Sequence, residues 1–243
     1  MKKLLLTSAL FLSLLAFAQN DLVAFSDLSN NDISVSKAQD VLLGEYDVES
    51  GKGRALGRDA YFFENKEKTK GVFLKSFLFK VDKANHRTKA NIRFYKKKEF
   101  VQEVYLDLGT LTYPSFVPGE VIEASDIVVY IEPGQKGIVE IDLSQYNIAM
   151  PADGLFVSLE GDGYFDIDGN KIASLKSKDL TQISFRPSVT DNYCGSATLY
   201  GKDSEFWINS NKMLKVDYNY AFKKEVPQKM LVAPNFGLKV GVK

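Results

Sequence analysis

Residues 137–143 read GIVEIDL, in which apolar and acidic side chains alternate from Val139 to Leu143. Successive side chains of a β-strand point to opposite faces, so a period of two predicts a strand that is buried on one side only. The expected inward side chains are Val139, Ile141 and Leu143, and the expected outward ones are Ile138, Glu140 and Asp142. The segment therefore predicts a sheet with one face on a hydrophobic core.

The same alternation recurs on both sides of this segment. It predicts further strands at residues 91–95, 101–108, 155–159 and 214–222. In the strand at 155–159, the expected inward side chains are Leu155, Val157 and Leu159, and Ser158 is expected to face outward or toward a sheet edge. Residues 72–81 are apolar on both faces, as in a central strand between two layers, and Ile127–Ile131 is a β-branched run. A helix is expected at most over residues 36–43.

The turns between these runs agree with a sheet protein. Proline, glycine and Asp-Gly pairs separate the predicted strands, for example at Pro118-Gly119, Pro133-Gly134 and Asp153-Gly154. Several strands that each have one apolar face need a second sheet to cover them. The predicted fold class is therefore all-β, a two-layer antiparallel β-sandwich of the jelly-roll kind.

Composition limits the classes of function. The chain has 243 residues, 45% of them hydrophobic, and 31 Lys and Arg balance 31 Asp and Glu. A disordered tail would have fewer hydrophobic residues and a higher net charge, and a nucleic-acid-binding protein would have an excess of Lys and Arg. A single histidine, His86, excludes multi-histidine metal centres. A single cysteine, Cys194, excludes an intrachain disulfide and any cysteine-rich metal site. We expect His86 in a solvated loop and Cys194 as a small buried residue.

The N-terminus has the layout of a secretory signal peptide. Lys2 and Lys3 precede an apolar run over residues 4–15, and Ala16-Phe17-Ala18 forms a small-x-small cleavage site. The alternative, a membrane anchor, needs roughly 20 apolar residues, and this run is shorter. We therefore expect residues 1–18 to be removed. The protein would be exported to the periplasm, the outer surface or the medium, with no membrane span.

The rest of the chain divides at a flexible turn. Residues 19–50 are polar and are expected to form an extended lead-in with one or two edge strands. Residues 51–243 carry the regular strand signals and are expected to form a single β-sandwich domain. A chain of this length can bury one large core without disulfides.

One part of the chain resembles a known module. Pro118-Gly119, the strand Ile127–Ile131, the segment 137–148 with its DLSQYNI, and GLFVSLE at 154–160 carry the likeness, which covers about residues 71–161. They resemble a β-sandwich module of secreted Bacteroidota proteins, mostly uncharacterised, that is often found with carboxypeptidase-regulatory-like domains. The resemblance implies fold and exported location more than function. Ile138 departs from it, because relatives tend to carry an aromatic residue there, often Trp.

A cluster of oxygen-bearing side chains lies in GDGYFDIDGNKI. It consists of Asp162, Asp166, Asp168 and Asn170. Oxygen ligands at alternate positions suit a hard cation, so a structural calcium ion is one interpretation. The other is a β-hairpin with Asp168-Gly169 as a type I′ turn.

Glu140 and Asp142 are candidates for an acid–base pair. Being two apart on a strand, they point the same way, and the carboxylates of glycosidases lie about 5–9.5 Å apart. The alternative is structural, because Asp142 opens DLSQYNI, where an Asx-type turn bond to the backbone is expected.

Aromatic residues suggest a binding surface. Phe206 and Trp207 are neighbours in a predicted strand and must point to opposite faces. Because Trp needs a partner for its N–H, we expect Phe206 inward and Trp207 partly exposed, with Tyr200 or Tyr193 widening the surface. The leading interpretation is a non-enzymatic binding or structural module for a glycan or another cell-envelope protein. The alternative is a glycan-acting hydrolase that uses a carboxylate pair.

Overall fold

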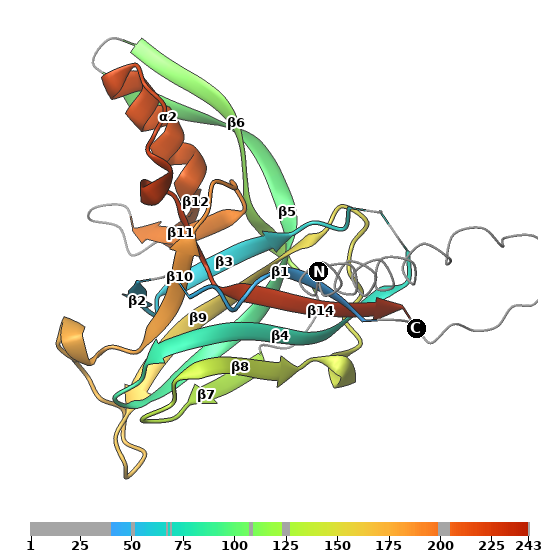
Figure 1. Ribbon diagram of the computed structural model, residues 1–243, viewed down its shortest axis with the longest axis vertical. Coiled ribbons are helices and arrows are strands. Elements are labelled where there is room, and N and C mark those ends of the chain that lie inside the picture. The colour runs from blue at the N-terminus through green and yellow to red at the C-terminus, as the bar shows by residue number, and fades with distance from the viewer. Residues whose placement is uncertain are drawn as a thin grey trace, which may run out of the picture. The chain divides into compact units, whose positions relative to one another are not determined.

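The computed structural model describes residues 40–49, 52–66, 68, 70–106, 109–122, 127–198 and 205–242, and Figure 1 shows its elements. The predicted signal peptide, the N-terminal part of the predicted lead-in to residue 39, and Tyr200 lie outside the described residues. Two antiparallel β-sheets, called sheet A and sheet B below, make up most of what is described. The predicted all-β, two-layer antiparallel sandwich is confirmed.

Sheet A is built around one long strand. Its strands are β1 (Val41–Glu45), β2 (Gly53–Ala55), β4 (Val72–Lys83), β8 (Gly137–Asp142), β10 (Gln182–Pro187), β13 (Val232–Pro234) and β14 (Phe236–Val242). Strand β4 pairs with β14 on one side and with β8 on the other, and β1 adds to β14. Strands β10, β2 and β13 continue the sheet at the far end of β4.

Sheet B runs in the order β12-β11-β3-β9-β5-β6, with β7 also paired to β5. Its strands are β3 (Arg58–Phe63), β5 (Arg87–Leu106), β6 (Gly109–Val121), β7 (Ile127–Ile131), β9 (Leu155–Phe165), β11 (Tyr193–Thr198) and β12 (Glu205–Asn209). The long hairpin of β5 and β6 extends beyond the rest of the sandwich, as Figure 1 shows. Within the described ranges, three short 3-10 helices lie in connections, at Ser144–Tyr146, Ser177–Asp179 and Gln228–Met230.

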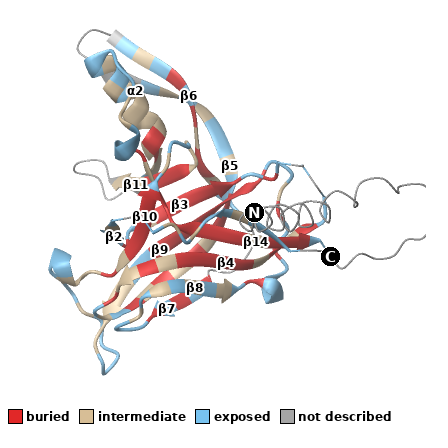
Figure 2. Ribbon diagram, in the orientation of Figure 1, coloured by how far each residue is buried: buried red, intermediate tan, exposed pale blue. Residues whose placement is uncertain are grey.

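The main core lies between the two sheets, where Figure 2 shows buried segments on strands of both. Phe77 of β4 packs edge-to-face on Phe236 of β14, with ring centroids 5.0 Å apart. The alternation predicted for β8 and β9 is confirmed on its inward side. Leu143, Leu155, Val157 and Leu159 are buried, and Val139 and Ile141 are partly buried against the core. Ile138, Glu140 and Asp142 are exposed, as predicted.

Ser158 points away from the main core, as predicted, but it is fully buried, so the expected exposure is wrong. The outer face of sheet B carries a second apolar cluster, which we call the second core. It consists of Ala60, Phe62, Tyr95, Val117, Phe156 and Cys194, with Phe100, Phe116 and Trp207 packed against it. Strand β9 is therefore covered on both faces. Cys194 is buried in this cluster, as predicted.

Strand β6 reaches back to β11 and β12 and closes over the second core. The backbone carbonyl of Phe116 accepts hydrogen bonds from the Cys194 thiol, at 3.7 Å, and from Asn209 Nδ2, at 3.2 Å. The curl of sheet B creates this extra layer. A single sequence shows no sign of it, since alternation alone cannot reveal that a polar face will be covered.

Residues 214–222 were predicted to be a strand, and this is wrong. They belong to α2 (Ser210–Phe222), the single α-helix among the described residues. Apolar residues recur there at every second position, from 214 to 222. Positions 214, 218 and 222 are also four apart, so they fit a helix face as well. Tyr218 and Phe222 indeed lie together, with ring centroids 4.6 Å apart. The side chain of Asn209 caps the helix by accepting a hydrogen bond from Lys212 N.

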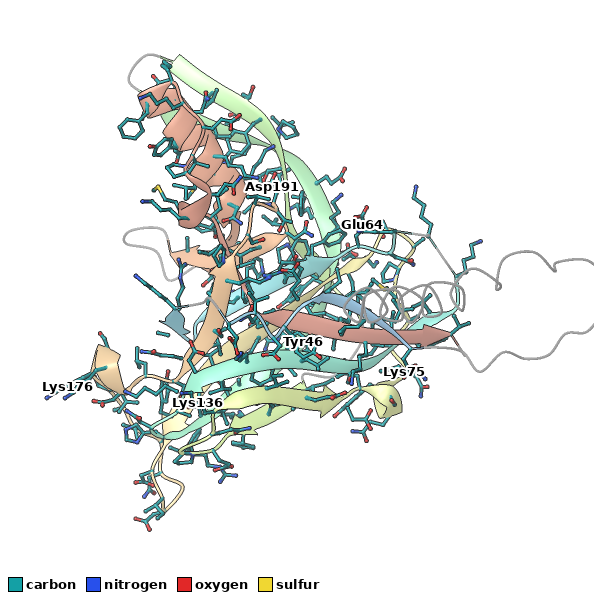
Figure 3. All side chains as sticks on the ribbon, viewed as in Figure 1. Tyr46, Glu64, Lys75, Lys136, Lys176 and Asp191 are labelled. Atoms are coloured by element: carbon teal, nitrogen blue, oxygen red, sulfur yellow. The ribbon has the colours of Figure 1, made fainter. Side chains whose placement is uncertain are left out.

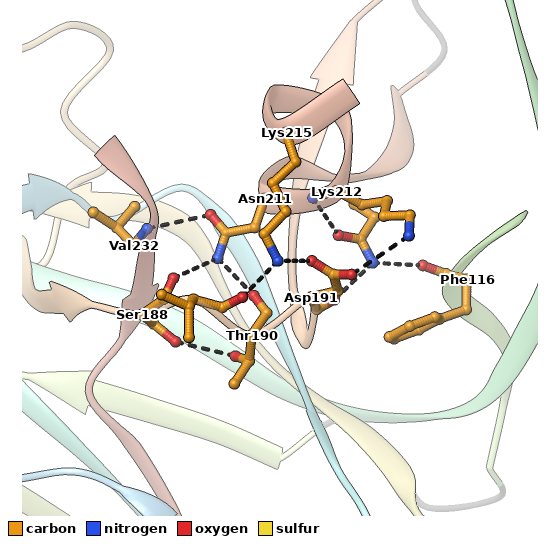
Figure 4. A network of polar contacts seen from close by, with 10 residues as sticks. Phe116, Ser188, Thr190, Asp191, Asn211, Lys212, Lys215 and Val232 are labelled. Atoms are coloured by element: carbon orange, nitrogen blue, oxygen red, sulfur yellow. Dashed lines mark hydrogen bonds and ion pairs between the residues drawn. The ribbon is translucent and has the colours of Figure 1, made fainter. Parts of the chain in front are cut away.

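A polar network fastens α2 to the loop after β10, as Figure 4 shows. Buried Asn211 donates through Nδ2 to the carbonyls of Ser188 and Thr190 and accepts from Val232 N. Lys215 Nζ lies 2.6 Å from Asp191 Oδ1. The 188–191 loop is thereby held in one position against the helix.

The helix expected at residues 36–43 is also corrected. Val41, Leu42 and Leu43 lie in strand β1, whose ladder with β14 runs from Val41 opposite Val240 to Glu45 opposite Phe236. Residues 36–39 lie outside the described part of the chain. Pairing with a core strand outweighs the weak helical pattern of a short segment.

Candidate functional site

The candidate site lies around Trp207, on the outer face of sheet B. In the ladder of β12 with β11, Trp207 stands opposite Ser196 and Phe206 opposite Ala197. Trp207 is partly buried against the second core, whereas Phe206 is 40% exposed. The expectation that Phe206 would point inward is wrong. The indole of Trp207 packs against the second core instead, and Phe206 points outward.

The indole of Trp207 is not an open platform. The guanidinium of Arg58 lies over the ring, 4.6 Å from its centroid. The ring of Tyr95 meets it edge-to-face, with centroids 5.9 Å apart and planes at 73°. A cation over an aromatic face and an edge-to-face pair are both favourable contacts. The surface feature is therefore a stack of indole and guanidinium.

Glu160 organises the charged groups beside this stack. Its side chain is only 9% exposed. Its Oε2 accepts hydrogen bonds from Arg58 Nε and Arg93 Nη1, both at 3.0 Å. Its Oε1 accepts from the hydroxyls of Tyr95 and Ser158, both at 2.7 Å. Burial raises the pKa of Tyr95, and its hydrogen bond to Glu160 raises the pKa further. The carboxylate thus fixes two guanidinium groups and a phenol in place.

A polar groove of about 430 Å³ opens next to Glu160. Its lining includes Arg58, Asn91, Arg93, Glu160, Asp162 and Ser196. Trp207 adjoins it, because Arg58 stacks on the indole and Ser196 is the cross-strand partner of that residue. Lys89 forms a 2.6 Å ion pair with Asp162, and this hydrogen bond holds the pKa of Asp162 below its usual range.

Tyr193 does not join Trp207. It lies on the opposite face of sheet B, in the main core, with its ring 5.5 Å from that of Phe185. Its hydroxyl donates to Asp59 Oδ1 at 2.9 Å. The expectation that Tyr193 would widen an exposed surface is therefore corrected. Tyr200, the other predicted partner, lies outside the described residues.

Two of the four predicted calcium ligands, Asp162 and Asp166, make other contacts within the protein. Asp162 pairs with Lys89, and Asp166 Oδ1 accepts hydrogen bonds from the backbone N–H groups of Asp168 and Asn170. These bonds hold the pKa of Asp166 below its usual range. Over the described parts of the chain, no three His, Cys, Asp or Glu side chains gather as a metal site would require. Calcium binding stays a prediction.

The hairpin turn differs from the predicted type. Gly169 N donates to the carbonyl of Asp166 at 3.1 Å, so Ile167 and Asp168 are the central residues. Only Gly169 has a positive φ, 83°, whereas a type I′ turn needs positive φ at both central residues. The turn is therefore not of type I′. Gly169 comes directly after the two central residues and adopts the left-handed conformation.

Glu140 and Asp142 are held by structural contacts. Glu140 Oε1 accepts from Lys239 Nζ at 2.7 Å and from Ser76 Oγ at 2.6 Å. Asp142 accepts from Ser144 N at 2.8 Å, which is the expected Asx-type bond. The pKa of Glu140 is lowered by Lys239 first, and the pKa of Asp142 by the Ser144 backbone. Carboxyls that stay ionised at neutral pH are poor general acids.

His86 lies in the connection between β4 and β5 and is partly exposed. Its backbone carbonyl accepts a hydrogen bond from the Thr88 hydroxyl at 3.1 Å.

Over the described residues no helix is long and apolar enough to cross a membrane.

It was not predicted from the sequence that Arg58, Arg93, Tyr95 and Ser158 gather around Glu160. Arg93 and Tyr95 alternate within one strand, and Ser158 and Glu160 within another, so each pair was visible as sharing a face. Their meeting depends on the register, which sets Glu160 opposite both Arg58 and Asn91 and sets Arg93 opposite Ser158. Glu160, at the end of the mostly apolar run 155–160, was a further local signal.

Comparisons of the chain with protein-family models, with curated proteins and with solved structures find no match. The resemblance of residues 71–161 to a module of secreted Bacteroidota proteins therefore stays a prediction.

Proposed function

We propose that this protein is a non-enzymatic carbohydrate-binding module that uses the groove beside Trp207. The observation that carries the proposal is the juxtaposition of the Trp207–Arg58 stack with a polar groove lined by Asn91, Arg93 and Glu160. Sugars present an apolar C–H face and a rim of hydroxyls. A partly exposed aromatic ring next to planar hydrogen-bonding side chains suits both.

The groove is preorganised for such a ligand. Glu160 anchors Arg58 and Arg93 through its Oε2, so neither guanidinium has to be ordered when a sugar arrives. Rigid donors reduce the entropy cost of binding. The indole offers only part of its surface, which supports affinities of roughly millimolar to micromolar, or about −4 to −8 kcal/mol.

The carboxylates support binding better than hydrolysis. Glu160 accepts four hydrogen bonds, two of them from arginines, and the pKa of Asp162 is held down by Lys89. Glu140 and Asp142 are likewise engaged in structural contacts. A glycoside hydrolase needs one carboxylic acid that keeps its proton near neutral pH, and the pKa shifts of Asp162, Glu140 and Asp142 go the opposite way.

Export belongs to the same proposal. The support is the charged, apolar and small-residue layout of residues 1–18. Mass spectrometry of material expressed in a bacterial host is expected to show Gln19 as the N-terminal residue. An intact Met1 on exported protein would contradict it.

The binding proposal is tested through the fluorescence of Trp207, the only tryptophan of the chain. A glycan-array screen with and without calcium selects a ligand, and a titration with that ligand is expected to shift the emission. Trp207→Ala should abolish retention in affinity electrophoresis while leaving the unfolding transition in place. Phe206→Ala is the matched control, because that ring projects from the other face of the same strand, and it should bind normally.

The results also separate the alternatives. Retention that survives Trp207→Ala would overturn the groove as the site. A screen with no glycan bound would overturn the function and favour the cell-envelope protein partner. Release of new reducing ends from a bound polysaccharide would favour the hydrolase.

A further inference from the structure

A second concavity, which we call the Arg186 cleft, has a volume of about 610 Å³. It opens between strand β1, the end of β3 and the loop that follows β10, and it shares no lining residue with the groove beside Trp207. Glu64, labelled in Figure 3, also lines it. The cleft has a size typical of small-molecule sites.

Arg186 is the unusual residue in this lining. Its side chain is only 3% exposed, and a buried cation needs compensating partners. Its Nε donates to Glu45 Oε2 at 2.7 Å, its Nη1 donates to the carbonyl of Pro234 at 3.0 Å, and its Nη2 lies 3.5 Å from the Tyr61 hydroxyl. Among the described residues these are its only acceptors, so part of its donor capacity is unused.

The counter-ion of Arg186 is held by a single hydrogen bond at the protein surface. Glu45 lies on edge strand β1, and its side chain is 68% exposed. It makes a single hydrogen bond to Nε, and the neighbouring Nη2 has only a long contact with Tyr61. A carboxylate that engaged Nε and Nη2 together would form the stronger bidentate pair. Water already competes for Glu45 at this exposed position, which lowers the cost of replacing it.

The rim of the cleft presents hydroxyl and amide groups. Ser188 Oγ and Thr190 Oγ1 lie 3.0 Å apart, and Asn192 lines the cleft beside them. The loop that carries them is fastened to α2 by Asn211 and by the Lys215–Asp191 ion pair, as Figure 4 shows. The guanidinium is positioned as well, because it lies over the Tyr61 ring, 5.5 Å from its centroid. The charged and polar groups are thus held in place.

We propose that the Arg186 cleft binds a small hydroxylated carboxylate, of the chemical class of a uronic acid. The ligand carboxylate displaces Glu45 from Arg186 and takes the bidentate position. Its hydroxyls meet the rim at Ser188, Thr190 and Asn192. The site is independent of the proposed groove beside Trp207.

The test is calorimetric titration of the protein with sodium D-glucuronate, with D-glucose at matched sodium chloride as the neutral counterpart. We expect millimolar binding of glucuronate and at least about tenfold weaker binding of glucose. Glu45→Gln removes the internal competitor and should tighten glucuronate binding by about two- to fivefold, the range that exposed ion pairs allow. Glu140→Gln is the matched control, an edge-strand glutamate paired with Lys239 outside the cleft, and should leave binding unchanged.

Arg186→Gln should abolish glucuronate binding, and its unfolding transition shows whether the variant is folded. If it is not, Glu45→Gln decides the question alone. Equal binding of glucose and glucuronate would overturn the carboxylate ligand. Weaker or unchanged binding by folded Glu45→Gln, or no binding of glucuronate by the unaltered protein, would overturn the cleft as its site.

Discussion

The hydroxyl of Tyr193 donates a 2.9 Å hydrogen bond to the carboxylate of Asp59, and the pair joins β11 to β3. Asp59 is 7% exposed. Burial raises the pKa of Asp59 to about 6, although the hydrogen bond from Tyr193 works in the other direction. Burial also raises the pKa of Tyr193, with the charge of Asp59 as the next cause. A buried carboxyl that titrates near neutral pH makes the stability of the sandwich depend on pH.

The native state binds the Asp59 proton more tightly than the unfolded chain does, since the pKa falls to its ordinary value of 3.8 on unfolding. The contribution of the protonated Asp59 carboxyl to the free energy of unfolding is therefore fully present below pH 3.8. It is lost as the pH rises through about 6. The full difference corresponds to about 3 kcal/mol, because one pKa unit is about 1.4 kcal/mol. Asp59→Asn keeps an acceptor for Tyr193 and removes this loss.

Denaturant unfolding at pH 8 is expected to find Asp59→Asn more stable than the unaltered protein by about 1–3 kcal/mol. At pH 3, below both pKa values, the two proteins should be nearly equal, provided that unfolding is still two-state there. A variant that is less stable at pH 8 would show that the ionised carboxylate is itself stabilising.

Glu160→Gln should be costly, because the amide would present N–H donors to arginines that now share a carboxylate. Removing one partner of a largely buried charged cluster costs about 3–5 kcal/mol, and partial exposure of Arg58 and Arg93 reduces this to about 2–4 kcal/mol. Glu140→Gln should cost less than about 1 kcal/mol, because Glu140 is 45% exposed and its partner Lys239 is 35% exposed. Urea unfolding of the three proteins checks the contrast, and equal losses would mean that Glu160 does not organise the site.

Leu159→Ala tests the main core. Leu159 of β9 is fully buried, so truncation removes apolar contacts and leaves a cavity, at a cost of about 2–5 kcal/mol. Ile138→Ala is the control, because that side chain is 45% exposed, and it should stay within about 0.5 kcal/mol. Thermal or urea unfolding measures both. A larger loss at Ile138 than at Leu159 would indicate that Ile138 is covered by another surface.

Asn209→Ala tests the attachment of α2. The side chain accepts from Lys212 N and donates to the carbonyls of Phe116 and Asp191, and the residue is 4% exposed. Losing the cap and leaving buried acceptors unpaired should cost about 2 kcal/mol or more. Asn219→Ala, on the exposed side of the same helix, should stay within about 0.5 kcal/mol. Hydrogen exchange should report faster opening of α2 in the first variant only.

Alternation predicted the faces of β8 and β9 correctly, because side chains of a half-buried strand point in turn to the core and away from it. Val157 inward and Glu140 outward follow from this order alone. The same period misled at residues 214–222, because Leu214, Tyr218 and Phe222 also lie four apart and so fit a helix face. The cap at Asn209 was a local sign of that helix, but its bonds to Phe116 and Asp191 exist only after the chain has folded.

The two-layer sheet fold, the inward residues of its core strands and the burial of Cys194 could be predicted from the order of the residues. These follow from side-chain periodicity and from the small apolar character of the thiol, which are properties of short segments. The position of the charged site, in contrast, depends on the tertiary structure. Arg58, Tyr95 and Glu160 meet because strand register and the curl of sheet B bring distant segments onto one face. The tertiary structure also decided that Ser158 is buried and that Tyr193 faces away from Trp207, since a strand's second face is polar or apolar according to what covers it.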